Sequence, residues 1–318
     1  MFTRREMMKF AAGGVALVGV GCGDGDGDGG GRGRWGESGL PLVAATTTMV
    51  ADLARSLGVG MVEVAALMGP EVDPHLFKPG QRDVQLLRGA EVVMYGGLHL
   101  EGRMAEMLER MERHGGRVFA VSAGLREGSV IEADGAHDPH IWGDASMWAD
   151  AAAYAVERLA GYFPARAEEM RARGKEAVAA LRAVHERLKA RAEEVPEGRR
   201  VLVTSHDAFR YFGRAYGFEV LSVQGIATVS EAALADMARI SGVIRSRGIK
   251  AVFVESSVSP ATIKRISEET GAVLGGELCS DALGAPGEMV EAGGRLVDKG
   301  TVGGMLEYNM DTIVRALR

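Results

Sequence analysis

The sequence predicts an α/β protein made of two parallel-sheet lobes that are joined by one long rigid helix. Short apolar runs alternate with segments of helical periodicity in two blocks, 40–163 and 197–318, and this alternation is typical of parallel α/β units. Between the blocks, residues 164–196 are rich in Ala, Glu, Arg and Leu and are bounded by Pro164 and Pro196. This composition predicts a single helix.

The first block predicts four buried strands with helices between them. The strands are expected at PLVAATT, VEVAALM, AEVVMYG and GRVFAVS, which are residues 41–47, 62–68, 90–96 and 116–122. Helical periodicity marks residues 49–58, 82–90 and 101–115. Strands that alternate with helices in this way pair in parallel.

The second block repeats the pattern and ends in a helix. Strands are expected at RVLVTS, EVLSVQG, KAVFVES and AVLGGEL, and helices at residues 208–217, 230–248, 260–271 and 301–317. The helix predicted between the blocks would span roughly 45 Å at the usual rise per residue. Such a helix is a rigid connection between the lobes.

The first 22 residues predict an export signal. Arg4 and Arg5 precede a short apolar run, residues 11–21, which ends at Cys22. The run is too short to cross a bilayer and suits a signal peptide. The paired arginines resemble a twin-arginine signal. The residues up to Cys22 resemble a lipoprotein cleavage site, although Gly19 stands where a leucine is usual. From this resemblance we expect Cys22 to be lipidated.

The next segment, residues 23–39, is rich in glycine and aspartate and is expected to be a flexible linker. The chain contains two cysteines, so lipidation of Cys22 would leave only Cys279 and no intramolecular disulfide. A net charge of −6 with no basic face argues against nucleic-acid binding.

Four side chains follow predicted strands and are candidate metal ligands. His75 lies beyond the second strand of the first lobe, and His140 follows that lobe's fourth strand. His206 directly follows the first strand of the second lobe, and Asp281 follows its last strand. Because functional side chains gather beyond the carboxyl ends of parallel strands, a cleft between the lobes would bring the four together. Three imidazoles and a carboxylate suit a divalent transition metal.

A single histidine after a strand is more often a hydrogen-bonded loop residue than a ligand, so the metal-site interpretation depends on the joint placement of all four residues.

The flanking segments are also similar to a known family. DPHLFKPGQRDVQLLRGAEVVMYGGLHLEGRM, HDPHIWGDASMWADAA, HDAFRYFGRAYGFEVLSVQGIATVSEA, VFVESSVSPATIKRISEETG and LEYNMDTIVRAL resemble the metal-binding solute-binding proteins of bacterial ABC importers. This zinc and manganese family includes TroA-like proteins.

The resemblance runs from residue 41 to the last residue and implies a ligand set. The family's metal ligands match His75, His140, His206 and Asp281, and its interlobe helix matches residues 164–196. Zinc-specific members often carry a His-rich loop between the first two ligands, which this chain lacks, while many manganese-specific members place glutamate where His206 stands. A third nitrogen ligand strengthens zinc binding. We therefore expect zinc first, manganese next and iron third.

Other polar residues near these motifs are expected to play structural roles. His137 is expected to be a solvated loop residue, and Glu255 a hydrogen-bonding side chain rather than a fifth ligand. Cys279 is expected to be a buried apolar residue. His185, in a charged helix, is expected at the surface.

The function that these residues predict is metal capture without chemistry on the metal. A monomeric protein in the periplasm or on the outer face of the cytoplasmic membrane, tethered there if lipidated, would deliver the ion to the permease of an ABC importer. Two alternatives stay open: a metal-buffering surface adhesin on the same scaffold, and an exported zinc hydrolase with Asp281 or Glu255 as general base. The sequence contains no HExxH-like motif that would favour the hydrolase.

Overall fold

The computed structural model of the chain describes residues 36, 38–133, 135–229 and 233–318. The predicted export signal with Cys22, and nearly all of the predicted linker 23–39, lie outside the described residues. Within the described part of the chain, no helix is both long and apolar enough to cross a membrane.

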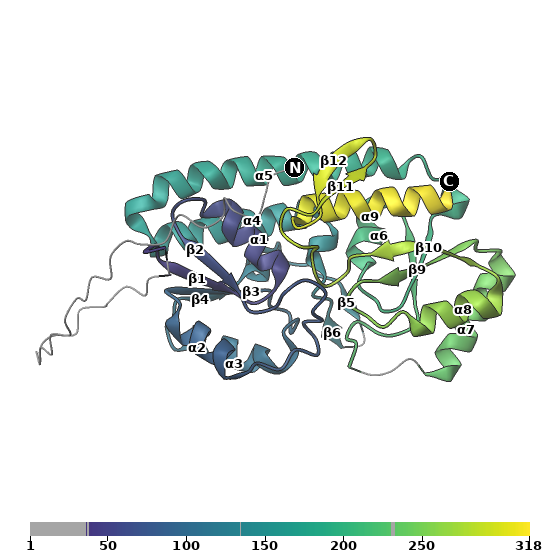
Figure 1. Ribbon diagram of the computed structural model, residues 1–318, viewed down its shortest axis with the longest axis horizontal. Coiled ribbons are helices and arrows are strands. Elements are labelled where there is room, and N and C mark those ends of the chain that lie inside the picture. The colour runs from purple at the N-terminus through teal and green to yellow at the C-terminus, as the bar shows by residue number, and fades with distance from the viewer. Residues whose placement is uncertain (1–35, 37, 134, 230–232) are drawn as a thin grey trace, which may run out of the picture. The chain divides into compact units, whose positions relative to one another are not determined.

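The first lobe is built on a parallel sheet, which confirms the predicted fold class (Figure 1). Its strands lie in the order β2-β1-β3-β4, with bounds β1 (Leu42–Ala45), β2 (Glu63–Ala66), β3 (Val92–Tyr95) and β4 (Val118–Ala120). Ala44 pairs with Ala65 on one side and with Val93 on the other. The strands are shorter than the predicted apolar runs because the runs continue into caps and loops.

The helices of this lobe are α1 (Thr48–Leu57), α2 (Gln81–Gly89) and α3 (Ala105–Arg113). Thr47 ends the run of β1 as the N-cap of α1, where its side chain accepts a hydrogen bond from the backbone N–H of Val50. Met49, Leu53 and Leu57 recur at intervals of four residues and are buried against the sheet. This spacing is the amphipathic pattern that predicted the helix.

The long helix predicted between the lobes is present, and a second helix packs along it. The predicted helix over 164–196 is a short 3-10 turn, Pro164–Arg166, followed by α5 (Ala167–Ala192). It is preceded by α4 (Ala145–Tyr162), which packs along α5. At the usual rise per residue, the 26 residues of α5 span about 39 Å. α5 contacts α1 in the first lobe and, in the second, α6 (Arg210–Tyr216) and α9 (Val302–Leu317).

The second lobe holds two hydrogen-bonded parallel pairs in place of one continuous ladder. β7 (Val201–Thr204) pairs with β8 (Glu219–Ser222), and β9 (Ala251–Glu255) pairs with β10 (Val273–Leu278). β7 and β9 lie against each other, so the pairs are neighbours. The remaining helices are α7 (Leu234–Arg247) and α8 (Ala261–Thr270). The first residues of the helix predicted from 230 lie outside the described residues.

Two antiparallel hairpins were not predicted from the sequence. One is β11 (Met289–Ala292) with β12 (Arg295–Asp298), and the other is the short pair β5 (Glu132–Ala133) with β6 (Ala136–His137). The first turns at Gly293 and Gly294, both with positive φ. Glycine adopts this conformation without a steric penalty.

The largest hydrophobic core runs through both lobes. It includes Val43 and Met94 of the first sheet, Trp148 of α4, and Leu202 and Phe253 of the second lobe. The two lobes are therefore packed against each other by apolar side chains, as well as joined along the chain. The polar residues considered next lie where the two lobes meet.

Candidate metal centre

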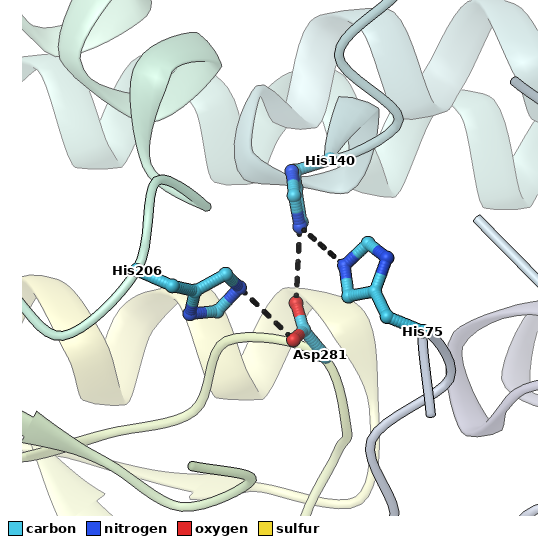
Figure 2. A group of neighbouring side chains, drawn as sticks. All are labelled: His75, His140, His206 and Asp281. Carbon is cyan, nitrogen blue, oxygen red and sulfur yellow. Dashed lines mark hydrogen bonds and ion pairs between the residues drawn. The ribbon is translucent and has the colours of Figure 1, made fainter. Parts of the chain in front are cut away.

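The four candidate ligands meet in one buried cluster (Figure 2). His75, His140, His206 and Asp281 each offer one ligand atom, and these atoms all lie within 4.8 Å of one another. His206 lies just beyond β7 and Asp281 just beyond β10, as expected for the carboxyl ends of parallel strands. His75 lies in the loop between β2 and α2. His140 lies further from β4 than expected, because the β5–β6 hairpin stands between them.

The nitrogen and oxygen atoms of the cluster face one another. The Nε2 atoms of His75 and His140 are 3.2 Å apart. Asp281 reaches both sides of the cluster, with Oδ1 3.3 Å from His140 Nε2 and Oδ2 3.0 Å from His206 Nε2. These contacts join candidate ligands of the first lobe to candidate ligands of the second.

The cluster leaves polar atoms that a cation would satisfy. Both carboxylate oxygens of Asp281 and the Nε2 of His206 are fully buried, and they make no hydrogen bond of good geometry within the described residues. Buried polar atoms in this condition are costly unless a partner is supplied. A divalent ion with nitrogen and oxygen ligands fits this set of donors.

Two further carboxylates hold the imidazoles in place. Asp138 Oδ1 accepts the backbone N–H of His140 at 3.0 Å and lies 2.8 Å from its Nδ1. Glu255 Oε1 accepts the backbone N–H of His206 at 2.9 Å, and its Oε2 lies 2.5 Å from His206 Nδ1. A carboxylate on Nδ1 leaves Nε2 free to bind a metal and fixes the direction of the ring. Glu255 therefore supports His206, as expected from the sequence.

The His75 turn packs against Gly102, which follows another buried carboxylate, Glu101. Glu101 Oε1 accepts hydrogen bonds from Thr46 Oγ1 at 2.7 Å and from the backbone N–H of Gly96 at 2.6 Å. Gly102, with φ +47°, packs against the backbone of His75, where a Cβ would stand 2.6 Å from the carbonyl oxygen. Glycine permits this close approach.

Charge in the closed cluster is shared between carboxylates and imidazoles. Burial disfavours the His140 cation, but Asp138 and Asp281 outweigh burial and raise the His140 pKa to about 9. Burial likewise opposes a charge on His206, but Asp281 and Glu255 raise its pKa well above the ordinary value. Burial lowers the pKa of His75 to about 4. His75 is therefore neutral at pH 7, while His140 and His206 hold protons that a metal ion would displace.

The segment that carries Asp281 is bound to the first lobe on both sides. Trp142 Nε1 donates to the carbonyl oxygen of Ser280 at 2.8 Å, and the Trp142 ring lies edge-on to His140 with centroids 5.3 Å apart. Thr48 Oγ1, at the start of α1, accepts the backbone N–H of Leu283 at 2.9 Å. The roles of Trp142 and Thr48 were not predicted from the sequence. The only indication was that Trp142 stands two residues after His140.

The structure also describes the other residues that the sequence analysis singled out. His137 is exposed, and Cys279 is buried with a pKa raised by burial to about 11, so its thiol is uncharged at neutral pH. The prediction that His185 lies at the surface is wrong. Its side chain is 16% exposed and its Nδ1 lies 3.2 Å from Asp144 Oδ1, because α5 turns this face towards α4 and α6.

Residues 43–316 match the family model for ZnuA, described as zinc-uptake complex component A, periplasmic. The chain belongs to this family. It is 37% identical over 285 residues to the zinc-binding protein TroA of Treponema pallidum, covering 88% of this chain and 89% of that one. The solved structure of periplasmic TroA superposes with a TM-score of 0.81, covering 88% of this chain and 99% of that chain at 38% identity.

Relatives in this family are named for different metals. The manganese-binding lipoprotein MntA of Bacillus subtilis is 38% identical over 287 residues, covering 87% of this chain and 89% of the relative. The iron-binding protein YfeA of Yersinia pestis is 27% identical over 243 residues, covering 76% and 78%. Family membership thus agrees with the resemblance inferred from sequence motifs, and the names span the three metals considered.

Proposed function

We propose that this chain is the extracytoplasmic binding component of an ABC importer, which captures a divalent transition metal ion and delivers it to a membrane permease. The convergence of His75, His140, His206 and Asp281 carries the proposal. Two ligands come from each lobe, so a bound ion joins the lobes. Separation of the lobes would then dismantle the site and release the ion.

Zinc is the proposed cargo, with manganese second and iron third. Three imidazole nitrogens and one carboxylate make a site in which affinity rises from manganese to zinc. The carboxylates of Asp138 and Glu255 support the proposal because they increase the basicity of His140 and His206. TroA, named for zinc, and MntA, named for manganese, are similarly close to this chain in sequence.

Binding is favoured over hydrolysis by the closed arrangement of the site. A catalytic zinc ion keeps a coordination position for water, whereas four protein ligands complete a tetrahedral shell. The four side chains are at most 6% exposed. Glu255, the general base of the alternative hydrolase function, contacts His206 with both of its carboxylate oxygens. We therefore propose a protein that is not an enzyme.

The proposed location is the periplasm or the outer face of the cytoplasmic membrane. The segment from Arg4 to Cys22 supports export and lipidation, and MntA is named a lipoprotein. The proposed partner is the permease of the importer, and the proposed state is a monomer. A metal-buffering adhesin would use the same site and would differ in having no permease to serve.

Competitive titration of the purified metal-free chain with zinc and manganese tests the proposal. We expect zinc to bind more tightly than micromolar and to displace manganese. The His75→Ala, His140→Ala double variant should lose at least tenfold in zinc affinity, because two of the four donors are removed. His206→Glu replaces a nitrogen donor by oxygen and should shift the preference towards manganese.

A matched control is His114→Ala, which removes an exposed imidazole on the first lobe. It should bind zinc like the unaltered chain. Micromolar or weaker binding of both metals by the unaltered chain would contradict the transport function. Unchanged zinc affinity in the His75→Ala, His140→Ala variant would contradict the ligand assignment.

A further inference from the structure

Asp73 is the one carboxylate in the first Asp-Pro-His turn, and it contacts both lobes. Its Oδ1 accepts the backbone N–H of His75 at 2.8 Å, which fixes the turn that presents the imidazole. Its Oδ2 accepts a hydrogen bond from Thr228 Oγ1 at 2.5 Å. Thr228 belongs to the second lobe, in the segment that follows β8. A single side chain therefore joins a ligand turn of one lobe to a loop of the other.

This contact lies at the more open side of the metal cluster. His75 is 6% exposed, whereas the other three ligands are between 0% and 1% exposed. Leu76 and Val229, the neighbours of His75 and Thr228, are 50% and 69% exposed. The Asp73–Thr228 hydrogen bond thus stands where the buried cluster comes nearest to solvent.

We propose that the hydrogen bond between Asp73 and Thr228 is a latch that holds the two lobes together over the bound metal ion and limits the rate of its release. This inference rests on the proposed function, because it requires the ion to leave by separation of the lobes. Asp73 and Thr228 are positioning residues in this arrangement. Neither is among the ligands, and Asp73 acts through the backbone of His75.

The latch should act on release much more than on capture. Hydrogen bonds to a charged acceptor are stronger than neutral ones, and this bond must break before the His75 turn and the Thr228 loop can part. Because the bond joins the two lobes, we expect it to form as they close around the ion. Loss of the bond should therefore accelerate dissociation by roughly tenfold, while the association rate stays within a factor of about two.

The experiment measures zinc release from the full-length chain by stopped flow, with an excess of a chromogenic chelator. Thr228→Val replaces the hydroxyl by a methyl group of similar size, and we expect release about tenfold faster than in the unaltered chain. Thr228→Ser restores the hydroxyl and should restore slow release. Thr270→Val is the matched control, because the Thr270 hydroxyl makes only local hydrogen bonds within the described residues, donating to the Ile266 carbonyl oxygen and accepting the backbone N–H of Ala272. It should release zinc at the original rate.

A double-mutant cycle separates the latch from a general loss of stability. In an Asp73→Ala background, Thr228→Val should have no further effect on release, because the shared bond is already absent. The inference would be overturned if the effects of the two substitutions on the release rate were additive. It would also be overturned if the Thr228→Val variant released zinc at the rate of the unaltered chain. An unaltered chain that bound no zinc would overturn the proposed function, and the latch with it.

Discussion

At the scale of single residues, the His140 imidazole is strongly affected by its surroundings. It lies between Asp138 on Nδ1 and Asp281 near Nε2, and both side chains are fully buried. These carboxylates raise the His140 pKa to about 9. Without metal, the closed site therefore carries a proton on His140 throughout the neutral range, and a ligand nitrogen must lose its proton before it binds a metal.

Zinc binding should therefore release protons at pH 7. His140 and His206 both have raised pKa values, so we expect about two protons released per zinc ion at pH 7. The apparent affinity should rise with pH through the His140 pKa of about 9. Calorimetric titrations in buffers of different ionisation enthalpy measure this number. Asp138→Asn removes a carboxylate that stabilises the His140 cation and should reduce the release by about one proton.

The control is Asp236→Asn, a half-exposed carboxylate on α7 that is paired with Arg239, which should leave the proton count unchanged. Binding at pH 7 without proton release would contradict the charge distribution described for the closed site. It would mean that metal-free His140 and His206 titrate at or below their ordinary pKa.

The two Asp-Pro-His turns indicate which contacts of a single residue can be predicted from the sequence. In both, the aspartate accepts the N–H of the histidine two residues later, at 2.8 Å in one turn and 3.0 Å in the other. Such a local bond can be predicted from the tripeptide. The second oxygen of Asp73 binds Thr228, far away in the sequence. No local pattern indicates that contact, because it depends on how the lobes pack.

At the scale of elements, the pairing of α4 with α5 determines how the lobes are connected. Gly174 of α5 faces Val156 of α4, where a Cβ would lie 2.6 Å from a methyl carbon of the valine. Both residues are buried. The helices can approach this closely only because residue 174 has no side chain.

Gly174→Ala should therefore destabilise the protein, although alanine favours helix formation. We expect a loss of about 1–3 kcal/mol in the free energy of unfolding, because the added methyl group forces α4 and α5 apart. Gly242→Ala on α7 is the matched control: that glycine is exposed, and nothing lies within 4 Å of a Cβ there. It should gain up to about 1 kcal/mol. Urea denaturation followed by circular dichroism measures both, and equal gains would contradict close packing at Gly174.

The elements that the sequence left unassigned have a common physical cause. α4 is buried around much of its circumference, with alanines at Ala145, Ala149, Ala151, Ala152 and Ala155. It therefore lacks the alternation of apolar and charged faces that identified α1. The β11–β12 hairpin covers α9, and its strands carry exposed apolar residues that resemble neither a core strand nor a helix. Periodicity identifies amphipathic elements, whereas these two depend on tertiary contacts.

At the scale of the whole described chain, two kinds of contact join the lobes. One is the apolar core that runs through both of them. The other is polar, and consists of the metal cluster together with Trp142, Thr48 and Asp73 around it. The sequence predicted which residues would meet, since the carboxyl ends of strands converge in such folds. It did not predict the supporting polar contacts, which join residues remote in sequence.

Zinc should stabilise both lobes together. Because the four candidate ligands come from both lobes of the folded chain, a zinc concentration 1,000 times its dissociation constant should add about 4 kcal/mol to the free energy of unfolding. The shared core predicts a single urea transition by circular dichroism, which shifts as a whole when zinc is added. The His75→Ala, His140→Ala variant should show little shift. Two transitions, of which only one responded to zinc, would contradict this account, since they would mean that one lobe unfolds without releasing the ion.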